Sequence, residues 1–256
     1  MRSVIREPRD QPPPQHFIQG LGRDFLNVLF ELGQAVLLML YGLAAARFLR
    51  QARARDELVR QIFFSGVKSL AVVTVVGGFT GMILALQTGL ELRRFGREVF
   101  IGTAVMVSML REMGPFMTGL ILAASVGSAM AAQIGTMTIS EEVAALEVMS
   151  IDPIRFLVMP RLLALGLMSP LLAFYSCLMG VAGGGIVGAT QLGIPWTAYL
   201  DNALRYAENK DLYVGMLKAL CFGLIIATAA CHQGFSTTRG AVGVGEATRN
   251  TVILSF

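Results

Sequence analysis

Charged residues are scarce in this sequence. Only 15% of its 256 residues are Asp, Glu, Lys or Arg, whereas 54% are hydrophobic and the mean hydropathy is +0.63. About a quarter of the residues of a soluble domain are charged, so this balance argues against an ordinary soluble fold. Several runs reach the roughly 20 apolar residues that a membrane-spanning helix needs. The composition predicts an all-α, polytopic integral membrane protein with about five transmembrane helices.

Residues that carry catalytic or metal chemistry are also few. The three cysteines form no C-x-x-C pair, and the two histidines stand far apart, so neither a disulfide framework nor a metal site is expected. The sequence has no G-x-x-x-x-G-K-[ST] phosphate loop, no G-x-S-x-G turn and no basic surface interleaved with aromatics. We expect no catalytic residue, no cofactor and no nucleic-acid partner. Any ATP with Mg would have to be bound by a partner subunit.

The first 60 residues are more polar than the rest. Residues 1–24 are polar and proline-rich, lack a leader pattern and are expected to form a cytoplasmic segment. Residues 25–60 hold an apolar stretch at 25–49 and a basic connector; the stretch fits an interfacial helix about as well as a span. Residues 61–256 form the membrane domain. Basic residues precede the first clear span, and the positive-inside rule therefore predicts a cytoplasmic N-terminus: Arg47, Arg50, Arg53, Arg55, Arg60 and Lys68.

Four later segments are apolar enough to cross a membrane: 69–90, 116–137, 162–188 and 212–231. The stretch at 99–113 is too short to cross, and Gly114-Pro115 should break or kink a helix because proline lacks an N–H group and constrains the residue before it. We therefore expect a re-entrant or half-length helix before this dipeptide. The last apolar stretch starts at Thr251 and stops after six residues, so we expect it not to complete a crossing and the last transmembrane helix to be either truncated or a stub.

Glycines recur along several of these segments at a spacing typical of closely packed membrane helices. In the first span, Gly77 and Gly81 form one such step. The others that we expect at helix–helix contacts are Gly127, Gly135, Gly180, Gly184 and Gly188.

An acid-rich stretch, SEEVAALEVMSIDP at 140–153, separates the second and third spans. Counting from a cytoplasmic N-terminus places it in the cytoplasm. Thr138 and Glu141 have the spacing of a capping box, and Asp152-Pro153 should end a helix, so the pattern predicts a helix over 139–151. Such a helix is either a solvated connector or a docking helix for a groove on a soluble partner.

One charged pair, Arg111 and Glu112, falls within an apolar segment. Charges at membrane depth are costly, so they usually face a protein interior or a wet cavity and mark a pathway. The alternative is that the half-length helix reaches only the interface, where both side chains extend into water.

Residues 111–164 resemble the signature region of the MlaE-like permeases, which are membrane subunits of ABC transporters that work with MCE-domain lipid-binding proteins. The matching stretch reads REMGPFMTGLILAASVGSAMAAQIGTMTISEEVAALEVMSIDPIRFLVMPRLLA, and the tail GAVGVGEATRNTVILS resembles the C-terminal motif of the family. The resemblance covers roughly residues 60–256, so residues 61–256 would form an MlaE-like permease domain.

The resemblance implies a homodimeric permease of the inner membrane with two cytoplasmic ATPase subunits, a periplasmic MCE-domain protein and a small STAS-type cytoplasmic subunit. The complex would pass phospholipid or a related lipid between membrane and MCE partner, as in systems that maintain outer-membrane lipid asymmetry. Arg111, Glu112, Gly114 and Pro115 match R-E-[LM]-G-P and would lie near the lipid path. A coupling helix would dock on the ATPase through Glu141, Glu142, Leu146, Glu147, Met149, Asp152 and Pro153.

The sequence departs from the family pattern in the second span. Many members carry A-G-R and A-E-I-G there, whereas this chain has neutral residues, including Ser125 and Gln133, so an ion pair is not expected at these positions. Two other function classes stay open. One is an ion-coupled secondary transporter with an Arg111-Glu112 relay, although no inverted repeat is apparent. The other is a membrane scaffold that anchors a lipid-binding partner.

Overall fold

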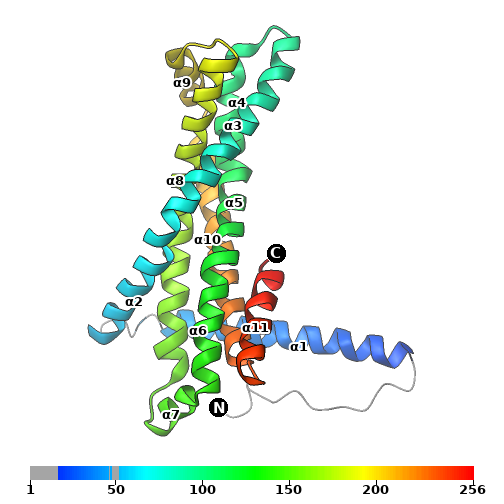
Figure 1. Ribbon diagram of the computed structural model, residues 1–256, viewed down its shortest axis with the longest axis vertical. Coiled ribbons are helices and arrows are strands. Elements are labelled where there is room, and N and C mark those ends of the chain that lie inside the picture. The colour runs from blue at the N-terminus through cyan, green and yellow to red at the C-terminus, as the bar shows by residue number, and fades with distance from the viewer. Residues whose placement is uncertain (1–16, 46, 48–51) are drawn as a thin grey trace.

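The computed structural model describes residues 17–45, 47 and 52–256, and over these residues the protein is a bundle of helices without a strand. Four long apolar helices run along its length, and Figure 1 shows them side by side. The all-α polytopic fold is confirmed, with four rather than about five helices long and apolar enough to cross a membrane in the described part. These are Arg55–Arg94, Glu98–Ile139, Ile154–Gln191 and Asn209–Phe235.

The first long helix joins α2 (Ala52–Ser65) to α3 (Leu70–Arg94) through a 3-10 turn at Val67–Ser69. It ends at a turn in which Gly96 has a φ of 63°. Its apolar centre contains the predicted span 69–90.

The second long helix runs from a 3-10 turn, η3, through two π-helical turns without a break. Of the break or kink predicted at Gly114-Pro115 the break is therefore wrong, as is the re-entrant or half-length helix before it. The π turn at Met109–Met113 relaxes the backbone before the proline. The carbonyl of Arg111, which Pro115 leaves without its usual N–H donor, accepts a hydrogen bond from Lys218 Nζ at 3.1 Å. Its elements are η3 (Glu98–Phe100), α4 (Ile101–Ser108), η4 (Met109–Met113), α5 (Gly114–Leu122), η5 (Ala123–Gly127) and α6 (Ser128–Ile139).

A short helix, α7 (Glu142–Val148), connects the second and third long helices at one end of the bundle (Figure 1). The third comprises a π turn, η6 (Ile154–Val158), and α8 (Met159–Gln191). At the other end, α9 (Trp196–Arg205) leads to α10 (Asn209–Phe235), the fourth long helix.

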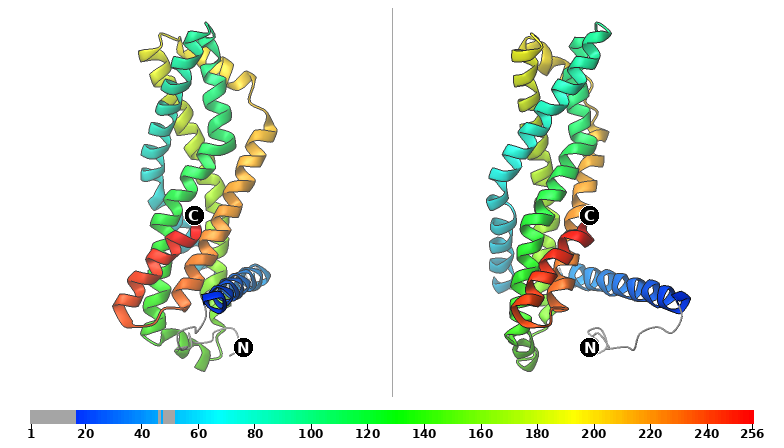
Figure 2. Two further views of the ribbon diagram at one scale, coloured as in Figure 1. Left: turned by 90° about the vertical axis from the view of Figure 1, so that its right-hand side faces the viewer. Right: turned by 45° about the vertical axis from the view of Figure 1, so that its right-hand side comes forward.

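The last helix, α11 (Gly240–Ser255), folds back against α6 and α10. Its 16 residues span about 24 Å at 1.5 Å per residue, which is short of the roughly 30 Å hydrocarbon core. In both views of Figure 2 the chain ends part of the way along the bundle.

The N-terminal helix α1 (Phe17–Ala44) covers most of the apolar stretch predicted at 25–49. Figures 1 and 2 show it running crosswise to the long helices, near the end that carries α7. This orientation is the one expected for a helix that lies along a membrane surface. Residues 1–16 of the predicted polar segment and residues 46 and 48–51 of the basic connector lie outside the described residues.

Helix α8 lies at the centre of the bundle and packs against α2, α3, α5 and α10. Its closest neighbour is α3, because glycines on both helices let the backbones approach. A Cβ atom on Gly81 would lie 1.8 Å from the Gly180 carbonyl oxygen, and one on Gly184 would lie 2.7 Å from the Tyr199 hydroxyl. A Cβ atom on Gly188, by contrast, would make only an ordinary contact, 3.5 Å from the Tyr199 ring.

Two other predicted packing glycines line the second long helix. A Cβ atom on Gly127 would lie 2.9 Å from the Ile226 side chain of α10. One on Gly135 would lie 2.8 Å from the hydroxyl of Thr237, between α10 and α11. Both positions therefore bring the fourth long helix and the segment after it close to α6.

Candidate functional site

The segment around α7 projects from the end of the bundle (Figure 1). The helix has seven residues, about two turns, and is shorter than the helix predicted over 139–151. Left-handed residues bound it on both sides, because Glu141 has a φ of 60° and Ser150 a φ of 59°. Such conformations are uncommon for residues other than glycine, and nothing in the sequence signals them.

The predicted capping box is wrong. The Thr138 hydroxyl donates instead to the carbonyl oxygen of Ile134 in its own helix, at 2.9 Å, and to that of Gly234 in α10, at 3.3 Å. The side chain that bonds near the start of α7 is that of Ser140, whose hydroxyl donates to Glu142 Oε1 at 3.0 Å.

Asp152 and Pro153 begin the next helix instead of ending α7. Asp152 Oδ1 accepts a hydrogen bond from the Ile154 N–H at 3.0 Å, as an N-cap residue does. Its Oδ2 also lies 3.2 Å from Arg155 Nε. Pro153 follows in the helical region with a φ of −59°, so its ring fits the first turn of η6.

The surface of α7 combines acidic and apolar side chains. Glu141, Glu142 and Glu147 are exposed, whereas Leu146 is half-buried against the bundle. Met149 is 61% exposed and Val148, which sequence reasoning did not single out, is 86% exposed. An apolar tip with acidic neighbours suits docking to a protein groove.

A second group of candidate residues lies where η4 meets α10. Arg111 Nε lies 2.5 Å from Asp211 Oδ1, and Lys218 Nζ lies 2.5 Å from Glu112 Oε1. The Asp211 side chain is only 4% exposed, whereas the other three are 37–64% exposed. The adjacent charges predicted from sequence are therefore each paired with an opposite charge on α10, and we call these four residues the charge cluster.

Sequence reasoning missed the α10 half of this cluster. Asp211 and Lys218 are seven residues apart, so they lie on one face of the helix two turns from each other. Opposite charges at that spacing, near the start of an apolar helix, could have marked Asp211 and Lys218 as candidate site residues. The spacing could not identify the partners, which lie about 100 positions away in the chain.

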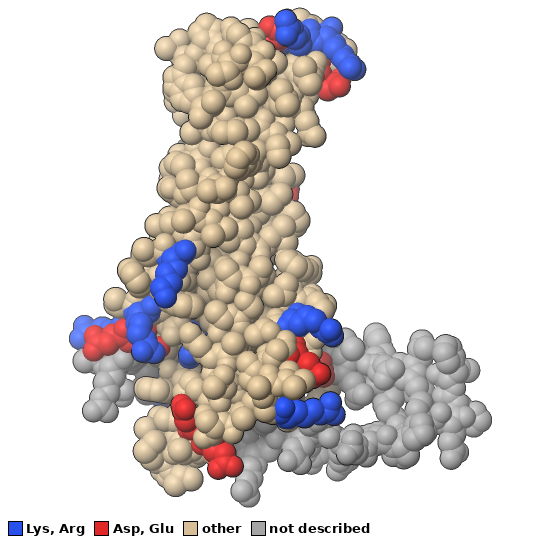
Figure 3. Space-filling model, in the orientation of Figure 1, with Lys and Arg blue, Asp and Glu red and all other residues tan. Residues whose placement is uncertain are grey.

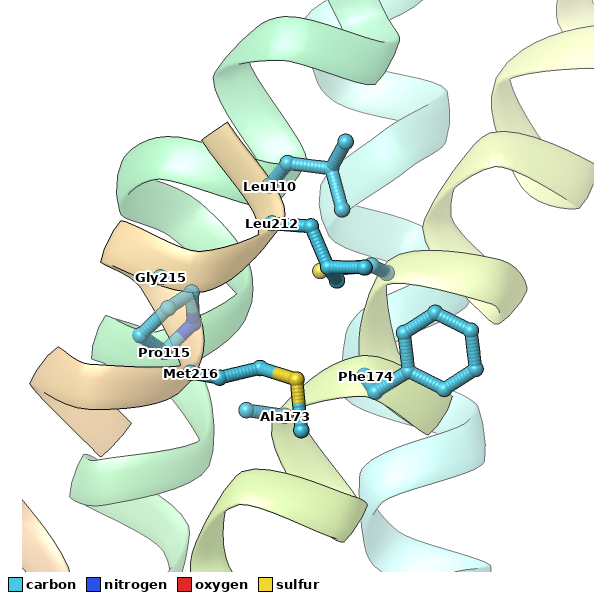
Figure 4. Close-up of a pocket in the computed structure, with 8 residues that line it drawn as sticks. Leu110, Pro115, Ala173, Phe174, Leu212, Gly215 and Met216 are labelled. Atoms are coloured by element: carbon cyan, nitrogen blue, oxygen red, sulfur yellow. The ribbon is translucent and has the colours of Figure 1, made fainter. Parts of the chain in front are cut away.

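A small apolar pocket adjoins the charge cluster (Figure 4). It opens between α5, α8 and α10, and two lining residues, Leu110 and Leu212, are sequence neighbours of Arg111 and Asp211. Gly114 packs nearby, since a Cβ atom there would lie 2.3 Å from the Cys177 sulfur. The pocket is lined by Leu110, Pro115, Ala173, Phe174, Cys177, Leu212, Gly215 and Met216.

The charge cluster and the apolar pocket lie side by side. An amphiphilic molecule requires such a combination, because its polar and apolar parts need different surroundings. In Figure 3 the middle of the bundle is nearly free of charged side chains on the face shown, and they gather toward its two ends. No group of three or more His, Cys, Asp and Glu side chains suited to a metal ion occurs within 17–45, 47 and 52–256.

The two positions that depart from the family pattern make different contacts. The Ser125 hydroxyl donates to the Ile121 carbonyl oxygen at 2.6 Å, one turn earlier in its own helix. Gln133 Oε1 accepts a long hydrogen bond, 3.5 Å, from Nη2 of Arg161 in α8. Neither contact is an ion pair.

Comparison with known proteins gives one consistent result. The family model described as Permease MlaE matches residues 58–256. A probable ABC transporter permease protein of Rickettsia prowazekii is 42% identical over 198 residues, which cover 77% of this chain and 76% of the relative. The intermembrane phospholipid transport system permease protein MlaE of Haemophilus influenzae is 31% identical over 242 residues, or 93% and 91% of the two chains.

A plant relative extends the comparison beyond bacteria. The chloroplast protein TRIGALACTOSYLDIACYLGLYCEROL 1 of Arabidopsis thaliana is 34% identical over 231 residues, covering 90% of this chain and 63% of its own length. All these matches include the region in which the resemblance was found. The chain belongs to the MlaE permease family.

Proposed function

We propose that this chain is the membrane subunit of an ABC transporter that moves phospholipid, or a related lipid, between the inner membrane and a periplasmic MCE-domain protein. Family membership supports the permease role, and the name of the Haemophilus influenzae relative supports phospholipid as cargo. The observation that carries the proposal is α7, an exposed acidic and apolar helix between two long apolar helices. This helix would give a soluble ATPase subunit a defined contact surface on the helix bundle.

In this proposal α7 is the coupling helix and docks in a cleft of a cytoplasmic ATPase, which binds ATP with Mg. Val148 and Met149 enter the cleft, while Glu141, Glu142 and Glu147 meet basic side chains at its rim. Leu146 holds the helix against the bundle, and Asp152 with Pro153 fixes the start of the next helix.

The N-terminus then lies in the cytoplasm. Helix α2 begins in the same half of the bundle as α7, and its Arg55 and Arg60 are exposed there (Figure 1). Basic residues at that end agree with the positive-inside rule for an inner-membrane protein. The crosswise orientation of α1 supports an interfacial helix on the cytoplasmic leaflet.

We further propose that lipid passes along the charge cluster and that two copies of the chain enclose it. Arg111, Glu112 and Lys218 are partly exposed in the single chain, and charges at membrane depth are stable only against protein or water. A homodimer provides that cover. A small STAS-type subunit on the cytoplasmic side rests on the family resemblance alone.

The experiment is purification of the complex from inner membranes, followed by reconstitution in proteoliposomes with labelled phospholipid. We expect ATPase and MCE-domain subunits to co-purify, and transfer to the MCE protein to require ATP. The variant Glu147→Lys should detach the ATPase because it reverses a rim charge, whereas Glu246→Lys, an exposed acid on α11, should leave the complex intact.

Other outcomes would contradict the proposal. Transfer that needs an ion gradient but neither ATP nor a partner would favour the secondary transporter. An assembled complex that never moves lipid would favour the scaffold. Normal ATPase binding by Glu147→Lys and by Glu141→Lys would refute the docking role of α7.

A further inference from the structure

Arg161 is a buried cation of α8 that the proposed lipid path does not use. Only 3% of the residue is exposed. Its Nη1 donates to the Leu157 carbonyl oxygen at 2.8 Å and its Nη2 to Gln133 Oε1 at 3.5 Å, while Nε has no hydrogen-bond partner. Among the residues that the structure describes, no carboxylate lies within ion-pair distance of this guanidinium. A buried charge whose hydrogen-bond acceptors are all neutral is destabilising, so a compensating role is expected.

The position of Arg161 suggests what that role is. Leu157 belongs to η6, the π turn through which the chain re-enters the bundle after α7. Gln133 belongs to α6, the helix from which the chain leaves the bundle before α7. One guanidinium therefore bonds to the elements on both sides of the α7 segment.

The same arrangement occurs at the charge cluster. The π turn η4 is followed two residues later by Pro115, and the Lys218 ammonium donates to the Arg111 carbonyl oxygen within it. The π turn η6 is likewise followed two residues later by Pro160, and Arg161 donates to a carbonyl within it. Prolines and π turns both disturb the backbone hydrogen bonds of a helix. Lys218 bonds to the carbonyl that Pro115 leaves without its donor, whereas Arg161 bonds to the Leu157 carbonyl, one residue beyond the Phe156 carbonyl that Pro160 leaves without its donor.

The two arrangements differ in charge. At η4 the cation is also paired with Glu112, whereas at η6 the second acceptor is the neutral amide of Gln133. An amide held at 3.5 Å separates more easily than a carboxylate, because a cation is attracted less strongly to a neutral acceptor than to an ionised one. The η6 arrangement can therefore hold α6 and η6 together in one state and release them in another.

We propose that Arg161 is a positioning residue that joins α6 to η6, so that a movement of α7 is passed to the second and third long helices together. The inference rests on the proposed docking of an ATPase at α7. It assigns to Arg161 and Gln133 the transmission of that movement, and not the binding of ATPase or lipid.

The test uses the whole complex in proteoliposomes and measures ATPase co-purification, ATP hydrolysis, lipid transfer and melting temperature. Arg161→Met keeps the length of the side chain and removes the guanidinium. We expect it to bind the ATPase and hydrolyse ATP, but to move about tenfold less lipid per ATP hydrolysed. Its melting temperature should not fall, because apolar replacement of a buried charge is often neutral or stabilising. Arg60→Met, at an exposed arginine of α2, is the matched control.

The unchanged melting temperature separates positioning from a structural role, which would lower stability and transfer together. Full transfer per ATP by Arg161→Met overturns the inference. If this variant does not assemble, Gln133→Leu decides, since it removes only the contact with α6; unchanged transfer in that variant also overturns it. A wild-type chain that binds no ATPase instead refutes the proposed function, whatever the variants do.

Discussion

Replacement of Gly81 by alanine should strongly destabilise the bundle. The new Cβ atom would lie 1.8 Å from the carbonyl oxygen of Gly180, whereas an ordinary contact needs at least 3.4 Å. Both partners are helix backbone, so no side chain can rotate away, and α3 and α8 would have to separate by about 1.6 Å along the contact. Overpacking of this kind costs about 3 kcal/mol, at the upper end of measured values.

Thermal unfolding of the purified protein in detergent is the assay. A loss of about 3 kcal/mol should lower the melting temperature of a chain of this size by roughly 6–12 °C. Gly78→Ala is the matched control on the same helix, because its Cβ atom would meet only the Met179 carbonyl oxygen, at 4.0 Å. A melting temperature of Gly81→Ala within about 2 °C of the control would refute the close approach of α3 and α8.

Three further predictions concern side chains. Asp211→Asn should lower the melting temperature by a few degrees because it breaks the ion pair that joins η4 to α10 at a buried carboxylate, whereas Asp201→Asn, at an exposed position of α9, should not; thermal unfolding distinguishes them. In the folded protein a maleimide should label Cys221 alone, since the other two cysteines are buried, and labelling of all three before unfolding would contradict the packing. Burial raises the pKa of the Tyr199 phenol, so stability should be complete below pH about 10 and fall above it, where only the unfolded chain ionises; Tyr199→Phe should reduce that fall in a pH series of melting temperatures.

The long helices could be predicted from the sequence because apolar length alone decides which segments suit a membrane. The boundaries and the number of these helices were harder to predict from the sequence. The rule that proline breaks a helix considers only local hydrogen bonds, and it failed at Pro115 because the compensating donor, Lys218, is 107 residues from the carbonyl that it reaches. Such a donor cannot be found before the helices are assembled.

At both candidate sites the sequence likewise predicted part of the arrangement and missed the rest. The α7 segment was visible as an acid-rich interruption, but the left-handed conformations of Glu141 and Ser150, which shorten its helix, have no sequence signal. Of the charge cluster, the sequence singled out Arg111 and Glu112 as charges within an apolar segment, and only the packing of α10 supplied their partners. The glycine spacing predicted that helices pack closely without indicating which ones meet.

The contacts between η4 and α10 also bear on how the chain is built during synthesis. The second long helix leaves the ribosome about 100 residues before Asp211 and Lys218. Until α10 is inserted, the Arg111 side chain lacks its ion-pair partner Asp211 and its carbonyl group lacks the bond from Lys218. The second helix therefore reaches its final form only after the fourth has been inserted beside it.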